Sequence, residues 1–236
     1  RIGSVREGQE AVEVDATSSS GRPSIAHYIR KLFVVSDNDA YNRLYEFVGQ
    51  EHMNRSLWEK GYCDVRLTHR LSTALSSEEN RHTNPFEFYR GDEVLYRQPA
   101  EYSAQRLSSD RRIEKGRGEL VDGALLYCPK DFSSANFMSV RVLQDLLRAV
   151  VFPNSMPPER RFTLSVEDHR FLLHAMSMLP RECVHPRYDH STYYDSYVKF
   201  FMFGDNKAPM PRHIRLFNKV GLAYGYLIDN AYIVDF

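Results

Sequence analysis

Several features are scarce or missing in this sequence of 236 residues. Its 31 basic and 31 acidic side chains give a formal net charge of +0, without the positive excess typical of nucleic-acid-binding proteins. No apolar run approaches the roughly 20 residues that a membrane-spanning helix needs. Cys63, Cys128 and Cys183 are far apart and form no CxxC pair, which argues against a disulfide framework or a zinc ribbon. We therefore expect no nucleic-acid partner, no transmembrane segment, and no metal or other cofactor.

The sequence also lacks an initiator methionine and opens on Arg1-Ile2-Gly3-Ser4. It shows no signal-peptide core, so we expect Arg1 not to be the first residue encoded by the gene. The length and the hydrophobic content of 42% suit one globular domain with a substantial core. The 15 tyrosines and 14 phenylalanines are typical of broad aromatic packing or of a substrate cleft.

Periodic apolar residues predict a helical layer. The spacing of positions 25, 28, 29, 32 and 33 is that of one apolar helix face. Similar patterns, ended by Gly49, Gly61 and Pro153, predict further helices. The expected helices are 25–35, 39–48, 51–60, 139–152 and 165–178, with a short one near 192–203.

Strand signals are fewer. Gly91-Asp92 separates two short runs and predicts a hairpin of 86–90 with 93–98. Two more strands are expected at 214–219 and 224–236. Residues 62–85 are expected to form a long ordered loop, and residues 99–138 are expected to be irregular and to lie on the surface. The fold class is therefore α+β, with a helical layer packed on a mainly antiparallel sheet and a cleft between them.

The triplet Ser36-Asp37-Asn38 lies between two predicted helices. All three residue types are favoured helix N-caps, so capping of the next helix explains the triplet without any further function. The functional alternative is a short loop that presents a hydroxyl and a carboxamide to a cleft. The hydroxyl could then relay a proton, and the carboxamide could bond a substrate amide.

The triplet Lys219-Val220-Gly221 lies on a predicted strand. An edge-strand lysine and a turn glycine are both common, so the triplet has a purely structural explanation. The functional alternative places a cation near a substrate carboxylate. The glycine would then let a ligand backbone pair with the strand edge.

Taken in order, the two triplets resemble the S-D-N and K-T-G motifs of the serine β-lactamase and penicillin-binding-protein superfamily. The class A β-lactamase-like hydrolases are the nearest group. Val220 occupies the threonine position, and residues 66–85 resemble the Ω-loop of that group. The resemblance covers roughly 24–85 and 139–236. Residues 86–138 would be an insertion within a single domain of residues 1–236.

Two departures from the family pattern stand out. None of the serines before Ser36 has a lysine three residues later; Ser4 is followed at that spacing by Glu7, and Ser24 by His27. In that family the S-x-x-K motif carries the nucleophile, and we expect this motif to be absent from the chain. The simplest explanation is a chain truncated at its start, and we expect truncation at its end as well. The segment 66–71 also lacks the acidic residue that activates the deacylating water. Glu78 and Glu79 come later and are expected to form ion pairs with Arg81.

The resemblance implies a serine hydrolase that acts through an acyl-enzyme on an amide or ester substrate, with this chain inactive alone. Ser36 and Lys219 would be catalytic, and Asn38, Val220 and Gly221 would bind a small-molecule or peptide substrate. It also implies a periplasmic or secreted location. The alternative is a non-catalytic domain that binds peptide or glycan on the same scaffold. The oligomeric state cannot be predicted from the sequence.

Overall fold

The computed structural model describes residues 1–5 and 10–236 of the chain. The α-helices are α1 (Ile25–Val35), α2 (Asn38–Val48), α3 (Gln50–Glu59), α4 (Val140–Val151), α5 (Val166–Ser177) and the short α6 (Phe200–Phe203). The 3-10 turns are η1 (Glu79–Arg81), η2 (Pro153–Ser155), η3 (Pro158–Arg160) and η4 (Pro180–Glu182). The five longer helices match the predicted ones to within a residue at each end. The short helix expected near 192–203 is confined to α6.

The strands form two-stranded antiparallel pairs in the described part of the chain. The strands are β1 (Val65–Arg66), β2 (Phe86–Arg90), β3 (Glu93–Gln98), β4 (Glu114–Lys115), β5 (Glu119–Val121), β6 (Ala124–Leu126), β7 (Lys130–Asp131), β8 (Phe137–Met138), β9 (Ile214–Ala223) and β10 (Tyr226–Asp235). The prediction of a mixed fold of helices and antiparallel strands is confirmed at this level.

Two strand predictions need correction. β9 continues past Lys219 to Ala223, so Gly221 lies inside the strand and the turn is Tyr224-Gly225. The stretch 99–138 is not irregular throughout, because short hairpins form within it and β8 pairs with β1. These strands are only two or three residues long, so they carry little of the alternating pattern from which strands are predicted.

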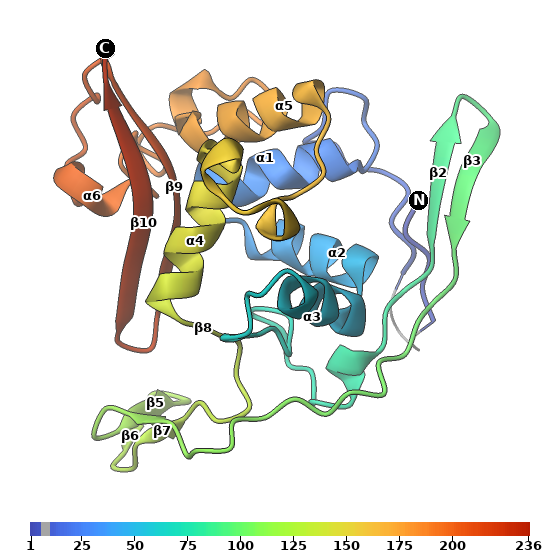
Figure 1. The fold of residues 1–236 in the computed structure, drawn as a ribbon, viewed down its shortest axis with the longest axis vertical. Helices are drawn as coiled ribbons and strands as arrows, with labels where there is room; N and C mark the ends of the chain where they lie inside the picture. The colour runs from blue at the N-terminus through green and yellow to red at the C-terminus, as the bar shows by residue number, and fades with distance from the viewer. Residues whose placement is uncertain (6–9) are drawn as a thin grey trace.

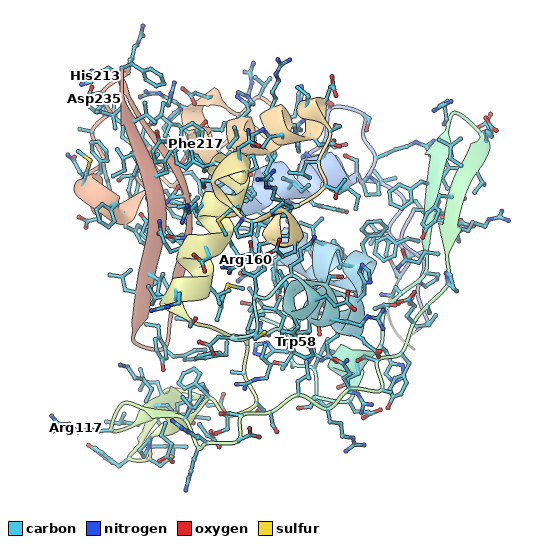
Figure 2. All side chains as sticks on the ribbon, viewed as in Figure 1. Trp58, Arg117, Arg160, His213, Phe217 and Asp235 are labelled. Atoms are coloured by element: carbon cyan, nitrogen blue, oxygen red, sulfur yellow. The ribbon has the colours of Figure 1, made fainter. Side chains whose placement is uncertain are left out.

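The β9–β10 ribbon lies along one side of the molecule, and α4 and α5 pack against it (Figure 1). Helices α1, α2 and α3 lie in the centre, and the β2–β3 hairpin lies at the opposite side. His213 and Asp235 mark one end of the ribbon, and Arg117 marks a small lobe of strands that extends away from the helices (Figure 2).

The described core is divided among several apolar clusters. One joins Tyr62 and Val65 to Val142 and Ala149 of α4. Another joins the end of α1 to the residues after α5, and a third lies under β9. The apolar face of α1 therefore packs toward α5, which fixes the end of α1 relative to the ribbon.

One polar stripe on α2 and α3 holds the loop 67–72. Its five side chains recur every four residues, which places three of them on one face of α2 and two on one face of α3. We call them the polar ladder. Their contacts are Asn38 Nδ2 to Ser72 Oγ (2.8 Å), Asn42 Nδ2 to the Leu71 carbonyl (2.9 Å), Glu46 Oε1 from Arg70 Nε (2.9 Å), Gln50 Nε2 to the Thr68 carbonyl (2.9 Å) and Asn54 Nδ2 to the Leu67 carbonyl (2.8 Å). The loop 67–72 therefore runs antiparallel to the two helices.

Asn136 holds the same loop from its other side. Its Oδ1 accepts hydrogen bonds from the backbone N–H groups of Thr68 (2.6 Å) and His69 (3.0 Å), and its Nδ2 donates to the His69 carbonyl (3.0 Å). The loop thus satisfies its backbone polar groups without regular secondary structure, which a partly buried loop requires.

We predict that Glu46→Gln lowers the free energy of unfolding by about 3 kcal/mol, because it leaves the charge of Arg70 buried and unpaired. The Glu46 and Arg70 side chains are only 5% and 4% exposed. Urea unfolding measures the change. The matched control is Glu51→Gln, which removes an exposed partner of Arg55 and should change the free energy by less than about 0.5 kcal/mol. A loss below about 1 kcal/mol in Glu46→Gln would contradict the central role of this pair.

Candidate functional site

Ser36 ends α1 in an unusual backbone conformation. Its φ of 56° and ψ of 44° are left-handed, and its N–H donates to the carbonyl of Lys31. Glycine is the usual residue at such a helix end, because a Cβ costs about 1 kcal/mol there. The serine side chain is therefore retained at a position where local stability favours glycine.

Asp37, rather than Ser36 or Asn38, caps α2. Its carboxylate accepts the N–H of Ala40 at 2.8 Å and lies 3.1 Å from the ammonium of Lys31. The capping interpretation of the triplet therefore holds for its middle residue. The hydroxyl of Ser36 and the carboxamide of Asn38 are left for other contacts.

Lys219 reaches Ser36 across 183 residues of sequence. Its Nζ donates to Ser36 Oγ at 2.7 Å and to the Val220 carbonyl at 2.8 Å. Burial lowers the pKa of Lys219 to about 8, while the carboxylate of Asp229 opposes that change. The ammonium is thus close to its own titration point at neutral pH, where a proton donor and acceptor is most effective.

Val220 and Gly221 continue β9 beyond this contact. The ideal Cβ position of Gly221 has no neighbouring atom within 4 Å, so space is open over that face of the strand. In the described residues β9 pairs with β10 alone, which leaves its other edge without a strand partner. An extended ligand backbone can pair with such an edge.

Asn38 is exposed beside the end of the loop 67–72, where it contacts Ser72. Asn38 Nδ2 donates to Ser72 Oγ at 2.8 Å, and Ser72 has a left-handed φ of 51°. Non-glycine residues with such backbones are frequent at functional sites. The sequence alone did not point to Ser72. The four-residue spacing of polar side chains from Asn38 to Asn54 was the available signal.

The two glutamates after the loop have structural roles. Glu78 Oε2 pairs with Arg81 Nη1 at 2.7 Å, as expected. Glu79 Oε2 instead accepts the backbone N–H and the hydroxyl of Ser76, both at 2.8 Å. Both contacts are local to the η1 turn.

The expectation that the S-x-x-K spacing is absent from the chain is wrong in one place. Ser196–Lys199 has this spacing, although it follows the Ser36–Asn38 loop in the sequence instead of preceding it. Both side chains are fully buried. The Ser196 hydroxyl donates to the Asn206 carbonyl at 2.8 Å, and in the described residues no hydrogen bond joins it to Lys199. This pair therefore does not present a nucleophile to the candidate site.

Lys199 is held by neutral oxygens. Its Nζ donates to the Met176 carbonyl and to Asn218 Oδ1, both at 2.6 Å. Burial lowers its pKa to about 7, and the next largest influence is the carboxylate of Asp229, which raises it. Asn218 immediately precedes Lys219, so the two lysines meet opposite faces of the same strand.

Comparison with known protein families gives a match to part of the chain. A family model described as the Beta-lactamase enzyme family matches residues 7–108. The resemblance to the serine β-lactamase and penicillin-binding-protein superfamily is confirmed. The match includes α1, α2, α3 and the Ser36–Asn38 loop, and it ends before Lys219. It supports a β-lactamase-like hydrolase in general.

No curated protein and no solved structure matches the chain significantly. Among the described residues, none of the helices combines the length and the apolar character needed to cross a bilayer.

We predict that Ser36→Gly is more stable to unfolding than Ser36→Ala by about 1 kcal/mol. Both substitutions remove the hydroxyl that Lys219 contacts, but glycine adopts the left-handed backbone without steric cost. Urea unfolding of the two variants provides the comparison. Equal stability would show that the backbone at position 36 is not held left-handed.

We predict that Lys199 makes stability depend on pH. Its pKa is about 7 in the folded chain against an ordinary 10.5, so between about pH 7 and 10 the unfolded chain binds a proton that the folded chain lacks. Stability then rises with pH in this window. From pH 7 to 9, wild type should gain about 1–2 kcal/mol in free energy of unfolding relative to Lys199→Met.

The exposed Lys207 offers the control for this measurement. Lys207→Met should differ from wild type by the same amount at both pH values. The assignment fails if Lys199→Met and wild type show the same change in stability from pH 7 to 9.

Proposed function

We propose that this chain carries the proton-transfer and substrate-binding part of a serine hydrolase that cleaves an amide or ester through an acyl-enzyme. The observation that carries the proposal is the 2.7 Å contact between Lys219 Nζ and Ser36 Oγ. It unites the two triplets at one place, and the family match over residues 7–108 supports the class of enzyme.

In this proposal Ser36 passes a proton to the leaving group. Its hydroxyl accepts a hydrogen bond from Lys219 and can donate its own proton onward to a leaving nitrogen or oxygen. The positive charge of Lys219 also attracts a substrate carboxylate. Because the pKa of Lys219 is about 8, the pair can lose and regain a proton near neutral pH.

The substrate would lie along β9. Its backbone would pair with the open edge at Val220 and Gly221, and Asn38 would bond its acyl side chain. Ser72 would hold the carboxamide of Asn38 in place through their 2.8 Å contact. A valine at position 220 offers no hydroxyl to a substrate carboxylate, so Lys219 would carry that recognition alone.

The nucleophilic serine would come from a segment other than these 236 residues. The serines before Ser36 lack the lysine partner, and Ser196 is buried away from the loop. No acidic side chain of 66–71 is available to activate the deacylating water. We therefore favour a DD-peptidase-like or esterase-like hydrolase over a fast β-lactamase. A periplasmic or secreted location is proposed on the family match alone.

The second candidate is a non-catalytic domain that binds peptide or glycan. The open edge of β9 favours it, because strand pairing with a peptide needs no nucleophile. In that case Lys219 would only neutralise a ligand carboxylate.

The whole protein encoded by the gene, treated with a fluorescent penicillin or a fluorophosphonate, tests the proposal. We expect covalent labelling of wild type and a rate of labelling at least about 100-fold lower in Lys219→Met. Lys207→Met should label like wild type. Absence of labelling in the folded whole protein would remove the acyl-enzyme mechanism and favour the binding domain. Equal labelling of Lys219→Met and wild type would remove Lys219 from the site.

A further inference from the structure

A chain of buried polar groups lies behind β9, on the side of the strand away from Ser36. The ammonium of Lys199 donates to Asn218 Oδ1 at 2.6 Å. The Nδ2 of Asn218 donates to Asp229 Oδ1 at 2.7 Å and to the Val198 carbonyl at 2.8 Å. The Oδ1 of this carboxamide accepts one hydrogen bond and its Nδ2 donates two. These three contacts fix its orientation.

The ends of this chain are anchored to other elements. Asp229 Oδ2 accepts the backbone N–H of Phe201 at 2.8 Å, which ties β10 to α6. Lys199 also donates to the Met176 carbonyl in the last turn of α5. The negative end of a helix dipole favours a cation at that place. The network therefore joins α5, α6, β9 and β10.

The network acts on Lys219 in two ways. Asn218 is its neighbour in the chain, so a fixed Asn218 also fixes the backbone from which the Lys219 side chain departs. Asp229 raises the pKa of Lys219, and the charge of Lys219 lowers the pKa of Lys199. The charge of Asp229 thus acts on Lys219 directly, whereas Lys199 acts on it through Asn218.

Two further charged groups act on Lys199. Glu182 of η4 raises its pKa and Arg215 of β9 lowers it. These two side chains pair with each other at 2.7 Å, so their effects largely cancel. Asp229 is then the main compensating charge for Lys199 and Lys219.

We propose that Lys199, Asn218 and Asp229 form a positioning network that controls the charge and placement of Lys219 from behind the strand. None of the three is a catalytic residue, since they lie across the strand from Ser36. Their effect on turnover rests on the proposed function, whereas their effect on Lys219 does not.

The test is the titration of Lys219 in the folded chain labelled with 13C-lysine, followed by NMR, with Lys219→Arg used to assign the signal. In Asp229→Asn the pKa of Lys219 should fall by about one pH unit, because the carboxylate that raises it is lost. Asp235→Asn removes an exposed carboxylate from the end of the same strand and should leave the titration unchanged. A purely structural role of Asp229 would leave the titration of Lys219 in Asp229→Asn as it is in wild type.

Lys199→Met covers the case in which Asp229→Asn does not fold. It removes the donor that holds the Asn218 carboxamide, so the NMR signal of Lys219 should move, because the backbone next to it is no longer fixed. An unchanged titration in Asp229→Asn, or an unchanged Lys219 signal in Lys199→Met, would overturn the proposal. Because the measurement needs no substrate, it can succeed even if the whole protein fails to label with penicillin or fluorophosphonate.

Discussion

The contact between Glu46 and Arg70 lies at the centre of the polar ladder, and the candidate site depends on it. Both side chains are buried, and Arg70 also donates to the His82 carbonyl at 2.6 Å. A buried charge without its partner is costly, so the loop 67–72 has one low-energy position along α2 and α3. That position places Ser72 beside Asn38, the first residue of α2.

The second constraint is the two-sided support of β9. On one side Lys219 contacts Ser36, and on the other Asn218 binds Lys199 and Asp229. Adjacent residues of a strand point to opposite faces, so one dipeptide connects the candidate site to a buried polar network. The strand needs no further strand partner at this edge to be held in place, which leaves the edge free for a ligand.

The sequence was sufficient for the elements that have strong periodicity. Helices α1 to α5 show the apolar spacing of one face, and their ends coincide with glycine, proline or a capping residue. The contact of Ser36 with Lys219 was expected only through the family resemblance, because no local pattern relates residues 183 positions apart. The polar ladder was missed because polar residues at helical spacing are typical of a solvent-exposed face. Only the opposing loop turns that face into a buried one.

The buried Lys199 was missed for a related reason. The sequence offers Asp195, four residues before Lys199, as a partner, but Asp195 pairs with Arg181. The oxygen partners of Lys199 come instead from α5 and β9. Burying a lysine whose hydrogen-bond partners are neutral oxygens lowers the stability of the fold. The left-handed backbone of Ser36 is a second unfavourable feature, and it lies on the opposite face of the same strand. A fold selected for stability alone would place glycine at position 36 and an apolar side chain at position 199. The strained backbone of Ser36 and the buried ammonium of Lys199 thus lie on the two sides of Lys219. Their coincidence is the physical argument that the surrounding residues maintain the charge of Lys219 as well as the packing of β9.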